Sequence, residues 1–179
     1  MKIKAKDITF LAMGIALFVV LSMCLRVPVF ENYYLCLGYI VMTVYIWCFN
    51  WYEGMIIGCL GVILYCIVGL LGFNGTPGWA TGNVVIGLIM GISLKFIKKI
   101  NNKILQTVIT AIVAIIATFI GIELVKSIID SFIVAQPFTL RFVKNFNSFI
   151  ADAFVIVISL PICVALDKVA RKLRYNENK

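Results

Sequence analysis

The sequence contains no histidine, and only 13% of its 179 residues are charged. Its six cysteines form no CxxC pair, so neither a zinc site nor a disulfide framework is supported. It also lacks a GxxxxGK(S/T) phosphate loop, a GxSG-like serine and a paired-carboxylate motif. We therefore expect no metal site, no resident cofactor and no enzymatic activity, and ATP would be used by partner proteins alone.

Apolar residues, in contrast, make up 63% of the chain. A soluble domain carries about twice this charged fraction, so the chain has too little polar surface to coat a water-soluble globule. The surplus apolar surface must face lipid, where a spanning helix needs about 20 mostly apolar residues. We predict an all-α integral membrane protein, with residues 1–179 forming a single bundle of six transmembrane helices.

The six expected spans are separated by polar or glycine-rich segments and lie at residues 8–25, 33–49, 55–71, 80–96, 104–125 and 146–166. The fifth run can continue as a helix to about residue 132. Residues 72–79 hold three glycines and a proline and predict a loop, and residues 131–145 predict a longer polar loop. The first run is longer than a signal-peptide core and lacks a small-x-small cleavage site, so we interpret it as a span.

Basic residues are distributed unequally between the alternate ends of these spans. The chain has 16 Lys and Arg against 8 Asp and Glu. Twelve of the basic residues fall in the N-terminal segment, the loop between spans 4 and 5, and the C-terminal tail, against four on the other side. Basic loops stay in the cytoplasm, so we predict two cytoplasmic termini. The basic excess is typical of membrane topology and does not indicate a nucleic-acid partner.

Small residues recur at four-residue spacing in three of the expected spans, as Ala12 and Ala16, Gly54 and Gly58, and Gly87 and Gly91. Such pairs open a groove that admits another helix backbone. We expect the two glycine pairs to serve internal packing. The alanine pair lies near the cytoplasmic end of the first span, where an external partner could reach it.

Polar and aromatic side chains gather toward the predicted outer ends of the spans. Charged residues inside a membrane are costly and usually mark a substrate or ion pathway. The cytoplasmic halves carry only isolated hydroxyls and amides, which indicates an outer polar cup above a dry floor. The outer group comprises Arg26, Trp79, Asn83, Glu123, Asn147 and Asp152.

A simpler interpretation of the same group remains open. Charges at helix ends can contact water or head groups, and Trp79 can be an interfacial anchor. This interpretation fits best the further charged residues near these outer ends, Lys126, Asp130, Arg141 and Lys144. Asn83 and Asp152 fit it least, because each lies a turn or more inside its span.

Length, six spans, cytoplasmic termini and a basic start together resemble the substrate-binding (S) component of energy-coupling factor (ECF) vitamin transporters. The closest motif is Ala12-Met13-Gly14-Ile15-Ala16, which is similar to the family's Ala-x3-Ala on its first helix. The glycine-rich segment 72–79 and the following span with Asn83 also resemble the family's third loop and fourth helix. The resemblance covers essentially the whole chain.

This resemblance implies a function and a set of partners. An S component of the bacterial plasma membrane captures a vitamin or vitamin-like molecule from outside with high affinity. It then docks on an ECF coupling transmembrane subunit that carries two ATP-binding cassette ATPases, and topples to deliver its ligand. The resemblance makes Ala12 and Ala16 docking residues, and the six outer residues listed above pocket candidates.

The ligand itself stays undetermined at this point. Four basic and four acidic residues around the expected cup balance in charge, while the aromatics favour a ring compound such as a flavin, pterin or pyrimidine. Pantothenate and a queuosine precursor remain open. Two rival functions also remain, namely a self-sufficient small transporter or channel and a ligand-free membrane scaffold.

Overall fold

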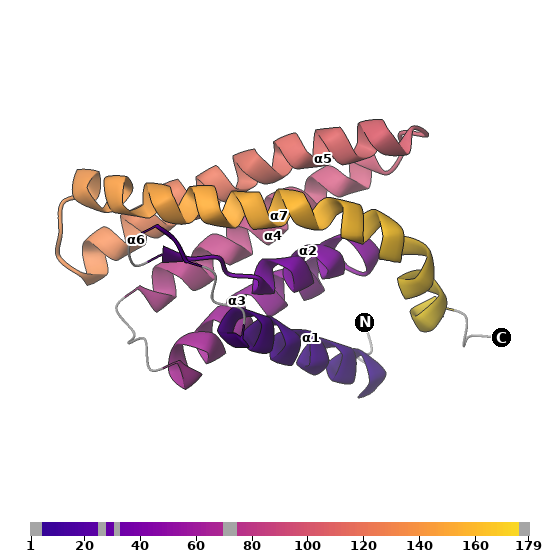
Figure 1. The fold of residues 1–179 in the computed structure, drawn as a ribbon, viewed down its shortest axis with the longest axis horizontal. Coiled ribbons are helices and arrows are strands. Elements are labelled where there is room, and N and C mark those ends of the chain that lie inside the picture. The colour runs from indigo at the N-terminus through magenta and orange to yellow at the C-terminus, as the bar shows by residue number, and fades with distance from the viewer. Residues whose placement is uncertain (1–4, 25–27, 31–32, 70–74, 176–179) are drawn as a thin grey trace.

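The apolar runs form helices, which satisfy every backbone hydrogen bond internally where lipid offers no partner. The computed structural model describes residues 5–24, 28–30, 33–69 and 75–175 (Figure 1). The helices are α1 (Ala5–Cys24), α2 (Gly38–Cys48), α3 (Trp51–Val68), α4 (Thr76–Ile97), α5 (Lys103–Thr118), the π-helix η1 (Phe119–Val125), α6 (Lys126–Ile133) and α7 (Phe138–Tyr175).

A short antiparallel ribbon was not predicted. Strand β1 (Pro28–Phe30) pairs with β2 (Tyr33–Tyr34) between α1 and α2. The span expected at 33–49 is therefore wrong at its beginning, because its first residues are extended and α2 starts at Gly38. With 11 residues, α2 is about 16 Å long and shorter than a bilayer core of roughly 30 Å.

Five helical stretches are long and apolar enough to cross a membrane, and α2 is a sixth, shorter apolar helix. The fifth expected span does continue, because α5, η1 and α6 form one stretch from Lys103 to Ile133. The six-helix prediction is thus confirmed for the number of apolar helical stretches within the described residues. The prediction is wrong for the length of the second helix, α2, which is shorter than expected.

Two predicted loops are shorter than expected. Helix α4 begins at Thr76 instead of residue 80, with Pro77 in its first turn, where the missing N–H costs no hydrogen bond. Helix α7 begins at Phe138, so the loop expected at 131–145 shrinks to a tight turn in which Ala135 has φ 50°. Both changes lengthen helices at the same end of the molecule.

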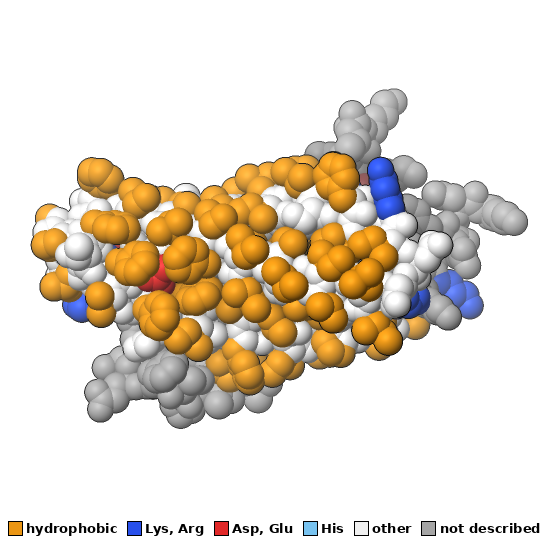
Figure 2. Space-filling view, turned by 90° about the horizontal axis from the view of Figure 1, so that it is seen from above, with side chains coloured by type: hydrophobic (Ala, Val, Ile, Leu, Met, Phe, Trp, Pro, Cys, Tyr) orange, Lys and Arg blue, Asp and Glu red, His pale blue; other side chains and the backbone are white. Residues whose placement is uncertain are grey.

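The two ends of the bundle differ in content (Figure 1). The start of α1, the turn from α4 to α5 and the finish of α7 lie at one end. The ribbon and the turn from α6 to α7 lie at the other. In Figure 2, apolar side chains cover the face between them, and most visible Lys and Arg lie toward the end where α7 finishes. This distribution suits a bundle embedded in lipid.

The glycine pairs of α3 and α4 pack internally, as predicted. A Cβ on Gly58 would lie 2.6 Å from the Met42 sulfur of α2, and one on Gly91 would lie 2.2 Å from the Trp51 Cβ of α3. Helix α4 also meets η1 backbone to backbone, because a Cβ on Gly82 would lie 2.6 Å from the Gly121 carbonyl oxygen. This close crossing brings the first turns of α4 beside the start of α6.

Candidate ligand-binding site

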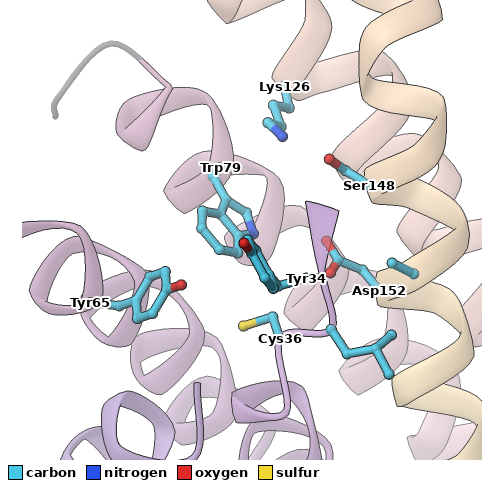
Figure 3. A pocket seen from close by; sticks show the side chains of 9 residues that line it. Tyr34, Cys36, Tyr65, Trp79, Lys126, Ser148 and Asp152 are labelled. Carbon is cyan, nitrogen blue, oxygen red and sulfur yellow. The ribbon is translucent and has the colours of Figure 1, made fainter. Parts of the chain in front are cut away.

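A cavity of about 230 Å³ opens at the end of the bundle that holds the ribbon and the α6–α7 turn (Figure 3). Strand β2 and the residues after it, α3, α4, α6 and α7 all contribute walls. Its lining residues are Tyr34, Leu35, Cys36, Tyr65, Trp79, Lys126, Ser148, Ala151 and Asp152. The cavity is small for a ligand site, since such sites usually measure roughly 300–1,000 Å³.

Aromatic rings form one side of this cavity. The Trp79 and Tyr65 rings meet edge to face, with centroids 5.9 Å apart and planes at 87°. The Lys126 Nζ lies 5.9 Å from the Trp79 ring centroid, within cation–π range. Tyr34 lines the cavity from the ribbon and remains 51% exposed. Flat, rigid rings of this kind suit a planar ligand.

A chain of hydrogen bonds fixes the Trp79 ring. Its Nε1 donates to the Tyr39 hydroxyl at 2.7 Å, and that hydroxyl donates to Asn83 Oδ1 at 2.7 Å. Asn83 Nδ2 in turn donates to the Gly58 carbonyl at 2.9 Å. Tyr39 and Asn83 are both fully buried. The chain therefore ties the indole of α4 to α2 and α3, and sets the plane of the aromatic wall.

Two groups of opposite charge face the same space. Figure 3 shows the Lys126 amine and the Asp152 carboxyl pointing from α6 and α7 toward the region beside Trp79. Asp152 is only 4% exposed and lies next to the Tyr39 hydroxyl. A buried charge within an apolar bundle is expensive and usually functional. The pair gives the cavity an amine on one wall and a carboxyl group on the next.

Cys36 forms part of the wall between the ribbon and α2. Its Sγ lies 3.2 Å from Ser22 Oγ, within hydrogen-bonding distance. Burial, and next the negative charge of Asp152, raises the pKa of the Cys36 thiol to about 12. The thiol is therefore neutral at physiological pH and acts as a small apolar side chain. All six cysteines are free.

A family model described as the ECF-type riboflavin transporter S component matches residues 2–168. The chain belongs to this family. A crystal structure of the S component for biotin from an ECF-type ABC transporter has a similar fold, with a TM-score of 0.66. It is 16% identical in sequence, and the match covers 93% of this chain and 95% of that one. No curated protein sequence matches. The chain is thus a substrate-binding subunit of a transporter and not an enzyme.

Two of the six predicted pocket residues of this S component, Trp79 and Asp152, line the cavity. Asn83 does not reach it, because its amide is occupied by Tyr39 and Gly58 one layer behind the wall. It is linked to Trp79 only through the Tyr39 hydroxyl. The amide was visible in the sequence, but a buried amide within a span is equally typical of a ligand contact and of a helix–helix bond.

The other three predicted residues lie outside the lining. Glu123 is fully buried on η1, and neither of its carboxyl oxygens has a hydrogen-bond partner in the part of the chain that the structure describes. Asn147 precedes the lining residue Ser148 but is not itself part of the wall. Arg26 falls outside the described residues. The structure therefore brings together only part of the predicted set.

Lys126 and Tyr65 line the cavity of the S component but were not chosen as site residues. The sequence did carry a signal for Lys126, which sits three residues after Glu123 inside a long apolar run. The structure places Lys126 beside Trp79 in the cavity wall. Tyr65 gave no signal, since an aromatic within a span is usually a packing residue.

The dry floor stays a prediction. Buried hydroxyls toward the opposite end bond within their own helices, where Thr43, Thr110 and Ser159 donate to the carbonyls of Tyr39, Gln106 and Ile156 at 2.6–2.7 Å. A hydroxyl whose proton is committed in this way can still accept a hydrogen bond but offers no donor to a passing solute. The Glu53 carboxyl at the start of α3 is also buried.

Proposed function

We propose that this S component captures riboflavin, or a vitamin with a similar flat ring, for an ECF transporter. Capture would take place at the exterior face of the plasma membrane. The observation that carries the proposal is the cavity, in which Trp79, Tyr34 and Tyr65 offer ring faces while Lys126 and Asp152 offer polar contacts. Apolar walls with a few directed polar groups are typical of small-molecule sites. The riboflavin family model supports the choice of ring.

The cavity faces outward if both termini are cytoplasmic. The basic N-terminal and C-terminal segments and the lysines of the α4–α5 turn support this orientation. The turn lies at the end of the bundle opposite the cavity (Figure 1). We place the protein in a bacterial plasma membrane, with the cavity open to the exterior.

Delivery would depend on docking through α1. Ala12 and Ala16 are exposed on this helix, beside the exposed side chains of Met13, Leu17 and Val20. Small residues one turn apart leave a shallow groove that another helix can enter. The partner would be the ECF coupling transmembrane subunit, whose two ATPases supply the energy. A dry lower half suits a body that topples whole and opens no channel.

The test is direct binding to the purified, ligand-free protein. We expect riboflavin to bind saturably at about one molecule per chain, and its fluorescence to be quenched by the aromatic wall. Biotin, thiamin, pantothenate and a queuosine precursor serve as competitors. Binding of one of these in place of riboflavin would overturn the choice of ligand, and binding of none of the panel would overturn the capture function.

A matched pair of variants locates the site. Trp79→Phe keeps a ring but removes the Nε1 bond to Tyr39, so we expect weaker riboflavin binding. Trp51→Phe makes the same change where Trp51 packs against Gly91 near the other end of α4, and should leave binding unchanged. An equal loss in both variants would contradict a site at the ribbon end.

A further inference from the structure

The hydrogen-bond chain behind the cavity has a direction. A primary amide has its donors on nitrogen and its acceptor on oxygen. Because Asn83 Nδ2 donates to the Gly58 carbonyl, its Oδ1 faces Tyr39 and accepts from the phenol at 2.7 Å. The Trp79 indole, a donor only, then donates to the phenol oxygen at 2.7 Å. The donors of the chain therefore run in one direction, from Trp79 through Tyr39 and Asn83 to the Gly58 carbonyl of α3.

This direction limits what Tyr39 can offer Asp152. The Tyr39 hydroxyl lies within hydrogen-bonding reach of the Asp152 carboxyl, but a phenol has a single proton, which Asn83 Oδ1 also accepts. A carboxylate has two oxygens and about four acceptor positions, so Asp152 keeps acceptor capacity where it lines the cavity. Because Asp152 is only 4% exposed, a donor on a ligand would satisfy an acceptor that bulk water reaches poorly.

Lys126 presents the opposite chemistry on the neighbouring wall. An ammonium has three donors and no acceptor, and Lys126 points into the cavity beside the Trp79 ring (Figure 3). Ser148 on α7 also points in, and its hydroxyl can donate or accept. The wall thus offers a donor at Lys126 and an acceptor at Asp152, next to a flat ring.

We propose that Asp152 is the specificity-determining acceptor of this cavity and takes a hydrogen bond from a ring N–H on the ligand, while Lys126 donates to an adjacent ring carbonyl. The inference rests on the proposed function and deepens it. The ligand class is a planar heterocycle with a lactam or imide edge, in which N–H and C=O alternate. Riboflavin has such an edge, because its N3–H lies between two carbonyl groups.

The experiment compares riboflavin with 3-methylriboflavin, which lacks the N3 proton, and measures the ratio of their dissociation constants. The wild-type protein should bind the methyl derivative roughly 10- to 100-fold more weakly, as expected when a hydrogen bond to a charged acceptor is lost. In Asp152→Leu this ratio should fall to about one. Leu has the same branching as Asp, so a merely steric rejection of the methyl group would survive the substitution.

Two control variants and one control ligand isolate the effect. Lys126→Met should weaken both ligands equally and keep the wild-type ratio. Asp130→Leu removes another buried carboxyl, one that does not line the cavity, and should also keep the ratio. 5-Deazariboflavin, altered away from the imide edge, should bind the wild type as riboflavin does.

The outcomes separate this inference from the function on which it rests. Equal binding of riboflavin and 3-methylriboflavin to the wild type would overturn the inference and leave riboflavin capture standing. A wild-type ratio that persists in Asp152→Leu would do the same. If riboflavin does not bind the wild type at all, the proposed function itself falls. The wild-type comparison needs no variant, so it remains decisive even if Asp152→Leu does not fold.

Discussion

The Tyr39 hydroxyl joins the aromatic wall to two neighbouring helices, although Tyr39 itself does not line the cavity. In Tyr39→Phe, Asn83 Oδ1 loses its donor and the Trp79 indole loses its anchor. We expect riboflavin binding to weaken by about 1–2 kcal/mol, or roughly 5- to 30-fold, and the melting temperature to fall. Fluorescence titration and thermal unfolding in detergent measure the two effects.

Thr43 provides the control for this prediction. It lies one turn along the same helix, is also buried, and donates only to the Tyr39 carbonyl. Thr43→Val removes a hydroxyl of similar burial without breaking the chain to Trp79. Riboflavin binding should stay at the wild-type value. A comparable loss of affinity in both variants would show that Tyr39 acts through general packing of α2.

The raised pKa of Cys36 leads to a second prediction. With the pKa near 12, the reactive thiolate is scarce at pH 7 and grows about tenfold per pH unit up to that pKa. A chain whose sole cysteine is Cys36 should react slowly with a maleimide, faster as the pH rises, and more slowly again with riboflavin bound. The exposed Cys24, as sole cysteine, reports reagent access. If the labelling rate of Cys36 is the same with and without riboflavin, Cys36 does not belong to the cavity wall.

Single residues show which parts of the candidate site could be predicted from the sequence alone. Trp79 and Asp152 could be identified from the sequence. An indole at the start of a span and a carboxylate inside a span both indicate a possible binding site. Lys126 and Tyr65 were missed because their role depends on which neighbours their helix faces. Asn83 was identifiable as unusual, but hydrophobic patterning does not say that a buried amide bonds to Tyr39 and not to a ligand.

Helix α1 has the smallest buried share of the candidate spans in the described residues, since only 17% of its apolar window is buried within the bundle. We expect the double variant Ala12→Trp and Ala16→Trp to bind riboflavin normally and to abolish uptake in cells that contain the coupling subunit and its ATPases. Bulky rings would fill the groove that the partner helix needs. Cellular uptake and binding to the purified protein are measured side by side.

Ala165 on α7 is a matched control, because it is also exposed and lies on a different helix. Ala165→Trp should retain uptake at the level of the unmodified protein. Normal uptake by the α1 double variant would refute docking through this helix. Loss of riboflavin binding in the same variant would show that the substitutions had disturbed the bundle instead.

At the scale of elements, hydropathy predicted which segments are helical but not where they begin. Pro77 and its neighbouring glycines indicated a loop, yet proline is favoured in a first helical turn, and α4 starts there. The first turns of α7 were predicted as a loop because they are polar. Asn145 in fact bonds to Ser127 of α6 at 2.9 Å, so polar residues of the two helices satisfy one another.

The π-helix η1 could not be predicted from hydrophobic periodicity, because it changes the backbone and leaves the apolar composition unchanged. It lies where Gly121 contacts Gly82 of α4. π-Helical segments are frequent at functional sites, and this one directly precedes Lys126. The local backbone change and the close glycine crossing thus lie directly before Lys126, which lines the cavity.

At the scale of the whole molecule, the two halves of the bundle differ in the hydrogen-bonding groups that they offer a transported solute. The cavity can hold a solute, but the buried hydroxyls toward the other end are already bonded within their own helices. A solute crossing that half would lose its hydrogen bonds to water and gain few in return, which is costly. Under the proposed function we therefore expect release into the cytoplasm to depend on movement of the whole bundle.

This argument predicts that the protein alone does not transport. Purified protein in liposomes should bind riboflavin yet accumulate none under a proton or sodium gradient. Adding the coupling subunit, the two ATPases and ATP should start uptake, and an ATPase variant that cannot hydrolyse ATP should prevent it. Gradient-driven uptake by the chain alone would instead identify a self-sufficient transporter. It would also require a polar route through the half of the bundle whose hydroxyls are now committed to their own helices.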